Sequence, residues 1–89
     1  MSFTLFGTLG CHLCDDAEQL IMQLAPIIID PVWQQDIAED ENLVERYGIR
    51  IPVLRHDQTG AELGWPFDSQ QLMQFITTHQ SQKEFDDDA

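Results

Sequence analysis

The sequence predicts a small α/β domain in which helices flank a four-stranded mixed sheet, in the order β-α-β-α-β-β-α. Three observations predict it. The chain opens with the alternation of a strand, continues with apolar residues at helical spacing, and later places two short apolar segments around a polar turn. Strands joined through a helix run parallel and the strands of a hairpin run antiparallel, so the sheet is mixed.

The first half of the chain is predicted to supply two strands and the longest helix. Residues 2–6 alternate small polar and apolar side chains, as a strand does. Residues 11–25 are predicted to be helical because apolar side chains recur at helical spacing, and Pro26 ends the helix. A second strand is expected at residues 32–37, while residues 27–29 fit either a loop or a strand.

A short helix and a hairpin are predicted next. Residues 43–47 form an apolar stripe, and Gly48 suits the left-handed conformation that often closes a helix. Residues 52–56 and 61–65 flank the polar turn 57–60, which is typical of a hairpin.

The last helix is predicted to begin at Asp68, because Asp68 and Gln71 have the spacing of a capping box. We expect residues 1–80 to form the domain and residues 81–89 to form an acidic, disordered tail, since three aspartates follow one another there. One face of the last helix carries Leu72, Phe75, Ile76 and His79.

Composition excludes several classes of function. The 89 residues are 43% hydrophobic, which suits one folded domain, and their formal net charge of −12 opposes binding to nucleic acid or to anionic membranes. No apolar run is long enough to span a bilayer, and the first ten residues lack the Lys or Arg that begins a secretory signal. We therefore expect a cytoplasmic protein.

The segment Cys11-His12-Leu13-Cys14 contains the only two cysteines of the chain. Cysteines three positions apart on the first turn of a helix can form a disulfide with each other. The thiolate is the reactive form, and the unpaired N–H groups of a helix N-terminus favour it at the first cysteine. The motif therefore favours a dithiol redox centre.

Two other interpretations of the motif stay open. A structural zinc site needs four ligands, and His56 and His79 are the remaining candidates, without a second pair of closely spaced ligands. A purely structural disulfide is also conceivable, although so short a ring constrains the unfolded chain little.

From Ser2 to about Gln80 the chain resembles the glutaredoxin branch of the thioredoxin-fold superfamily, and more closely small glutaredoxin-like proteins with Cys-His-Leu-Cys before acidic residues. The resemblance implies a thioredoxin-like fold. The segments that carry it are Phe3–Phe6, Gly10–Asp15, Leu43–Leu54 and Leu63–Asp68.

The resemblance also implies roles for single residues. Cys11 would be the exposed nucleophile that forms a mixed disulfide with substrate, and Cys14 would resolve it. The Ile51-Pro52 bond would be cis and face the cysteines, so that the backbone of Ile51 pairs with a bound thiol-bearing chain. From the residues alone, Pro52 also fits a trans proline that opens a strand.

The loop before the last helix is expected near the cysteines, and Gly64 and Trp65 are its candidate substrate-binding residues. Trp65 fits either packing or the wall of a substrate groove. At His12 we hypothesise an imidazolium that supports the Cys11 thiolate against the negative charges that follow Cys14, with an exposed spacer as the alternative.

The sequence thus predicts a monomeric thiol–disulfide oxidoreductase of glutaredoxin-like type, without a metal or a bound cofactor. Its partners would be a disulfide-bearing protein or a small thiol substrate. Glutathione is a candidate reductant, but it is net anionic and no cation precedes Cys11, so a basic protein substrate fits the acidic surface better. The alternative is a redox-inactive binding or adaptor module that presents a groove at Trp65.

Overall fold

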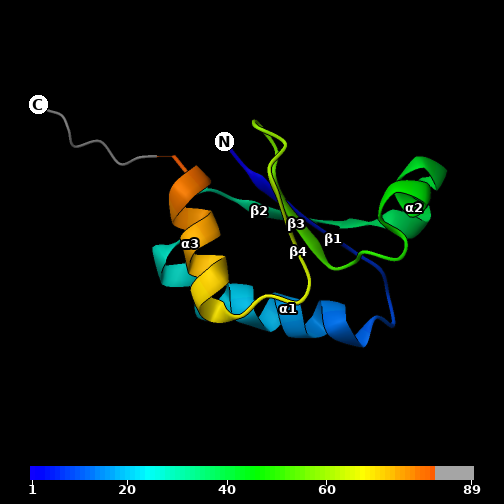
Figure 1. Cartoon of the computed structure of the whole chain (residues 1–89), viewed down its shortest axis with the longest axis horizontal. Coiled ribbons are helices and arrows are strands. Elements are labelled where there is room, and N and C mark those ends of the chain that lie inside the picture. Colours follow the sequence, from blue (N-terminus) through cyan, green and yellow to red (C-terminus); the bar gives the residue numbers. More distant parts are fainter. Residues whose placement is uncertain (82–89) are drawn as a thin grey trace, which may run out of the picture.

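A four-stranded sheet runs through the molecule in the order β2-β1-β3-β4 (Figure 1). This computed structural model of the protein describes residues 1–81, so residues 82–89 of the predicted acidic tail lie outside the described residues. The strands are β1 (Phe3–Gly7), β2 (Val32–Asp36), β3 (Val53–His56) and β4 (Glu62–Gly64).

Three α-helices connect and cover these strands. Helices α1 and α3 lie along one side of the sheet, and α2 lies apart from them beside one end of it (Figure 1). The element order confirms the predicted β-α-β-α-β-β-α arrangement. The helices are α1 (His12–Gln23), α2 (Glu41–Tyr47) and α3 (Ser69–His79), with short 3₁₀ helices at Ala25–Ile27 and Ile37–Glu39.

Strand β1 is the centre of the sheet. It pairs in parallel with β2 and antiparallel with β3, which in turn pairs antiparallel with β4. The predicted hairpin and the mixed character of the sheet are therefore confirmed. The register sets Leu5 beside Leu54 and Phe6 beside Val53, so neighbouring side chains on the two strands share a face.

Alternation along β1 divides the core between the two faces of the sheet. Phe3 and Leu5 point toward α1 and α3, where they pack with buried residues of both helices. Phe6 points to the opposite face, where it packs with Tyr47 of α2. The larger cluster comprises Phe3, Leu5, Ala17, Ile21, Leu54, Phe67, Leu72 and Ile76. The smaller one comprises Phe6, Ile37, Tyr47 and Val53.

Several predicted boundaries differ from the structure by one or two residues. The strands predicted at residues 52–56 and 61–65 span Val53–His56 and Glu62–Gly64, and the helix predicted at residues 43–47 begins at Glu41. Helix α1 ends at Gln23, because Pro26 disfavours helical backbone at Ala25, and a 3₁₀ helix takes over instead. Strand β2 ends at Asp36, whose side chain accepts a hydrogen bond from the Ala38 N–H and caps the next 3₁₀ helix.

The expected left-handed conformation of Gly48 was wrong. Gly48 has φ −49° and ψ −40°, which is right-handed helical backbone. A glycine is still needed there, because a Cβ atom would lie 2.5 Å from the carbonyl oxygen of Val44. A glycine at position 48 is therefore required by its close approach to the preceding helical turn, and not by a left-handed conformation.

The predicted capping box at the start of α3 is present. The Asp68 carboxylate accepts a hydrogen bond from the Gln71 N–H, and the Gln71 side chain accepts one from the Asp68 N–H. Phe67 before the cap and Leu72 within the helix are both buried in the larger cluster, which fixes how the chain enters α3. Within residues 1–81, no helix is long and apolar enough to cross a membrane.

Candidate active site

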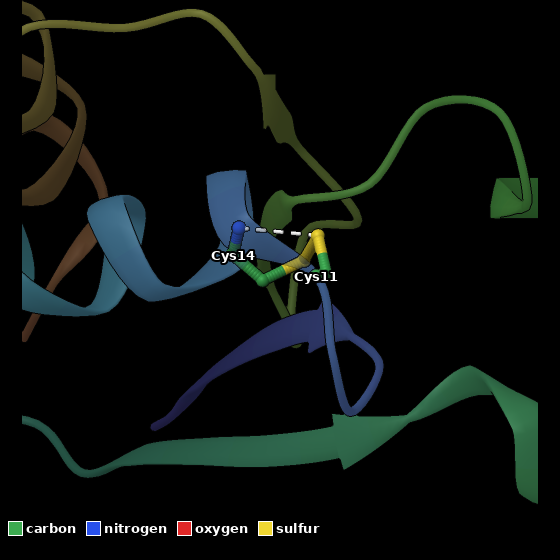
Figure 2. The surroundings of a disulfide bond; sticks show 2 residues. All are labelled: Cys11 and Cys14. Atoms are coloured by element: carbon green, nitrogen blue, oxygen red, sulfur yellow. Dashed lines mark hydrogen bonds between the residues drawn. A yellow bond between two sulfur atoms is a disulfide. The ribbon is translucent and has the colours of Figure 1, made fainter.

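The two cysteines meet at the N-terminus of α1, where they form a disulfide (Figure 2). Cys11 is the N-cap residue, in extended conformation, and its Sγ accepts a hydrogen bond from the Cys14 N–H at 3.1 Å. The two Cα atoms are 5.2 Å apart, within the usual range for a disulfide. The sulfur of Cys11 therefore faces the unpaired N–H groups of the first helical turn.

The two cysteines differ in exposure to solvent. Cys11 is half-buried, whereas Cys14 is only 8% exposed. His12 and Leu13, which lie between them in the sequence, are both exposed. This asymmetry suits an outer cysteine that meets a substrate and an inner one that does not. The role of His12 stays a prediction.

Gly7, at the end of β1, lies directly against the inner cysteine. A Cβ atom on Gly7 would lie 3.0 Å from Cys14 Sγ and 3.2 Å from Cys14 Cβ, closer than side chains normally approach. The last residue of β1 must therefore be small for Cys14 to occupy its place. This contact was not predicted from the sequence, where its one signal is a glycine that ends a strand four positions before Cys11.

Pro52 lies on the other side of Gly7. The β1–β3 register pairs Phe6 with Val53, and continuing it by one residue sets Gly7 beside Pro52. The Ile51-Pro52 peptide bond is cis. Gly7 thus has Cys14 against it and Pro52 beside it in the sheet, and the expected position of Pro52 facing the cysteines stays a prediction.

Trp65 lies beside Pro52. Its N–H donates a hydrogen bond to the Pro52 carbonyl at 3.1 Å, and its ring packs edge-on against Phe67 with centroids 5.0 Å apart. Trp65 is half-buried, which fits its packing role, and Gly64 beside it is exposed. The Trp65-Pro66 bond is also cis, which sequence analysis did not anticipate.

Ile51 is less available than expected. Its N–H donates to the carbonyl oxygen of Tyr47 at 3.1 Å, so this donor is already used within the domain. The side chain of Ile51 is half-buried against the smaller core cluster. Only the carbonyl of Ile51 is left to pair with a bound chain.

A pocket of about 400 Å³ opens beside the cysteines on the side of β2. Its walls come from the segment Gly7–Gly10, the first turns of α1 and the end of β2. Cys14 and Asp15 belong to this lining. The carboxylates contributed from β2 and the 3₁₀ helix after it were not assigned to the site from sequence, because only the folded chain brings them to α1.

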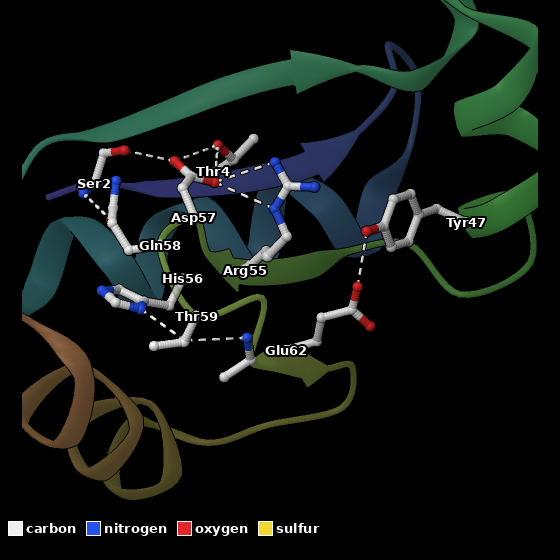
Figure 3. Close-up of polar contacts among 10 residues, drawn as sticks. Ser2, Thr4, Tyr47, Arg55, His56, Asp57, Gln58, Thr59 and Glu62 are labelled. Atoms are coloured by element: carbon white, nitrogen blue, oxygen red, sulfur yellow. Dashed lines mark hydrogen bonds and ion pairs between the residues drawn. The ribbon is translucent and has the colours of Figure 1, made fainter.

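The arginines lie around Tyr47 instead of around the cysteines. Arg50 forms an ion pair with Glu62 at 2.6 Å, and the Tyr47 hydroxyl donates to the same carboxylate at 2.7 Å (Figure 3 shows the Tyr47–Glu62 bond). Partial burial raises the pKa of Glu62, but the hydrogen bonds from Arg50 and Tyr47 outweigh it and hold that pKa below its ordinary value. Burial and the contact with Glu62 raise the pKa of Tyr47.

Metal-ligating residues do not gather in the described part of the chain. Among residues 1–81, no three His, Cys, Asp or Glu side chains form a group that could hold a metal ion. His56 is buried against the ring of His79, with centroids 5.4 Å apart, and its Nδ1 shares a hydrogen bond with the Thr59 hydroxyl.

A family model described as Glutaredoxin-like domain (DUF836) matches residues 2–77. The chain belongs to this glutaredoxin-like family. The match spans every strand and the Cys11–Cys14 pair, which confirms the resemblance stated from the sequence.

Solved structures agree with this assignment. This glutaredoxin-like domain is similar to the X-ray structure of target protein XcR50 from X. campestris, with 37% identity and a TM-score of 0.75, covering 85% of this chain and 96% of that chain. The solution structure of the same target is similar at 37% identity and a TM-score of 0.74, covering 88% and 95%. The comparison with curated proteins finds no match. The predicted thioredoxin-like α/β fold is confirmed.

Proposed function

We propose that this domain is a thiol–disulfide oxidoreductase in which Cys11 is the nucleophile and Cys14 the resolving cysteine. The observation that carries the proposal is the asymmetric pair at the N-terminus of α1: an accessible N-cap Cys11 hydrogen-bonded to the Cys14 N–H, above a Cys14 that is 8% exposed. Helix N-termini stabilise thiolates because their unpaired N–H groups and dipole favour negative charge.

The proposed reaction moves two electrons from the dithiol to a substrate disulfide. The Cys11 thiolate attacks one substrate sulfur, a bond forms between them, the substrate S–S bond breaks, and the leaving thiolate takes a proton. The Cys14 thiol loses its proton and attacks the Cys11 sulfur, which releases the second substrate thiol. The protein ends with the Cys11–Cys14 disulfide seen in the structure, and the substrate ends as two thiols.

Recycling needs an external thiol reductant. We infer that no cofactor is bound and that the reductant is a diffusible thiol or a protein dithiol, with glutathione as one candidate. A cytoplasmic setting suits this reaction, because thiols there are kept reduced. We also propose that the domain acts as a monomer on a disulfide-bearing protein or a small thiol substrate.

Three further residues are proposed to hold the substrate. The free carbonyl of Ile51 accepts one backbone hydrogen bond, next to the cis bond at Pro52. The half-buried Trp65 and the exposed Gly64 lie beside Pro52, whose own side chain is buried. This arrangement supports an extended chain crossing the end of the sheet.

A trapping experiment tests the proposal. In the Cys14→Ser variant, incubated with a model peptide disulfide, we expect mass spectrometry to find one peptide thiol linked to Cys11, because the resolving step is blocked. The matched Cys11→Ser variant keeps Cys14, which is 8% exposed, and should form little adduct. Equal adduct on both variants would contradict the assignment of Cys11 as the nucleophile, and no adduct on either would favour the redox-inactive binding module.

A further inference from the structure

The pocket beside the cysteines is placed to receive a neighbour of the reacting disulfide. Its lining includes the segment Gly7–Gly10, which immediately precedes Cys11, and also Cys14 and Asp15. Cys14 reaches this wall although it is only 8% exposed. Cys11 itself is not part of the lining, but it directly follows Gly10, which is, so the residues next to a substrate sulfur held at Cys11 lie near the opening. At about 400 Å³ the pocket is in the range that holds a side chain or a small ligand.

The lining of the pocket is acidic. Four carboxylates line it and no Lys, Arg or His does, so its formal charge is −4. The residues come from both sides, two from α1 and two from the end of β2 and the following 3₁₀ helix. They are Asp15, Glu18, Asp36 and Glu39.

Within the described chain, the hydrogen bonds that these carboxylates accept all come from neutral donors. Glu18 accepts a hydrogen bond from the Gln34 side chain, and Glu39 accepts one from the Gln35 side chain at 3.4 Å. Asp36 accepts the Ala38 N–H at 2.9 Å. Neutral donors hold the carboxylates in place but leave their charge uncompensated.

Two carboxylates elsewhere in the domain are paired with arginine. Asp57 is paired with Arg55 at 3.2 Å, and Glu62 is paired with Arg50 at 2.6 Å. Neither carboxylate lines the pocket. Each of the three arginines lies away from the pocket, so no arginine compensates the charge of its lining.

We propose that this pocket binds a cationic side chain, a Lys or Arg, that lies next to the disulfide of a polypeptide substrate. The inference rests on the proposed oxidoreductase function and adds the substrate class. A cleft lined by charge of one sign concentrates ligands of the opposite sign and raises their association rate. The same field repels net-anionic substrates such as glutathione.

Matched peptides test this proposal directly. Three cyclic disulfide peptides with the same cysteine spacing would carry Lys, Gln or Glu beside the cysteines, and each would oxidise the reduced full-length protein in a single turnover. For the wild type we expect the Lys peptide to react roughly tenfold faster than the Glu peptide at low salt. The ratio should shrink on going from about 0.01 M to about 1 M salt, because the screening length falls from about 30 Å to about 3 Å.

A pair of double variants separates the pocket from overall charge. Glu18→Gln with Glu39→Gln removes two pocket carboxylates, and Glu41→Gln with Glu45→Gln removes two exposed ones on α2. Both change the net charge from −12 to −12 + 2 = −10. We expect the Lys-to-Glu rate ratio to fall about threefold or more in the pocket variant and to stay near the wild-type value in the α2 variant.

Two results would overturn the pocket assignment: a wild-type ratio near one, or an equal loss of preference in both double variants. If the reduced protein reduces none of the peptide disulfides, the proposed redox function fails instead.

The pocket assignment is then tested by measuring the binding of the same peptides with a non-reducible thioether bridge. Lys peptides that bind no tighter than Glu peptides would contradict it.

Discussion

At the scale of single residues, the close contact between Gly7 and Cys14 determines how the inner cysteine sits. Gly7 ends the central strand, and the space where its side chain would be is taken by the sulfur of Cys14. The contact joins the sheet to the first turn of α1. Any side chain at position 7 has to displace the inner half of the redox pair.

The Gly7→Ala variant should therefore be less stable. Its new methyl group would lie 3.0 Å from Cys14 Sγ, and overpacking of this kind costs about 1–3 kcal/mol of unfolding free energy. Urea unfolding of the oxidised proteins measures it. Gly64→Ala is the control, since a Cβ there meets no atom within 4 Å, and its effect should stay within about 0.5 kcal/mol. Equal stability of the two variants would contradict this account of Gly7.

Prediction from sequence was strongest for residues with local roles. The capping pair Asp68 and Gln71 could be found because both partners lie within one helical turn. The importance of Gly48 was also visible, but not its reason, since a Cβ clash with the Val44 carbonyl depends on the exact course of the chain. The Gly7 contact with Cys14 could not be found, because it needs the helix to fold back on the strand.

At the scale of elements, hydrogen bonds to Asp57 connect the start of β1 to the turn after β3 (Figure 3). Its carboxylate accepts hydrogen bonds from the hydroxyls of Ser2 and Thr4 at 2.6 and 2.8 Å, and from Arg55 at 3.2 Å. Partial burial raises the pKa of Asp57, but these hydrogen bonds together hold it below its ordinary value.

This carboxylate should make stability depend on pH in the acid range. A pKa that is lower in the folded state adds stability above the ordinary value near 3.8, and this stability is lost as the pH falls through the folded-state pKa. We expect Asp57→Asn to lose about 1–2 kcal/mol at pH 7 and progressively less below pH 4.

Urea unfolding at a series of pH values measures the difference between the two proteins. The exposed Glu45→Gln variant serves as the control and should change little at any pH. A loss for Asp57→Asn that is the same at neutral and acid pH would show that its charge is not what joins these elements.

The order and pairing of elements could also be predicted from sequence. Alternation in β1 and the helical spacing in α1 follow from which side each residue presents to the core, and the structure confirms both. The ends of β2 and α1 differ from the prediction because the Asp36 side chain caps the next 3₁₀ helix and Pro26 disfavours further α-helix. The pocket could not be predicted, because its two walls come from α1 and β2.

At the scale of the whole molecule, the three arginines lie close together within residues 1–81. Arg46 and Arg50 lie over the ring of Tyr47, 5.7 and 5.3 Å from its centroid, and Arg55 lies 4.8 Å over Phe6. Phe6 and Tyr47 are themselves stacked, with centroids 4.3 Å apart. The arginines are thus gathered on one aromatic cluster, and none of them lines the pocket beside the cysteines.

The acidic residues of this domain therefore differ in their surroundings. Glu62 and Asp57 are paired with arginine and contribute to stability. The carboxylates that line the pocket beside the cysteines have no arginine partner, and there we infer that they select the substrate. The net charge alone, which is all that composition provides, does not separate these two groups.

The most direct test of the central claim is a redox titration of the Cys11–Cys14 pair. The protein would be equilibrated with thiol–disulfide buffers of graded potential, and its free thiols would be alkylated and counted by mass spectrometry. We predict one reversible two-electron transition in which both cysteines react together, at a potential between about −270 and −120 mV, as in thiol oxidoreductases. Thiols that stay free at every potential, or a disulfide that resists reduction below about −300 mV as structural ones do, would contradict it.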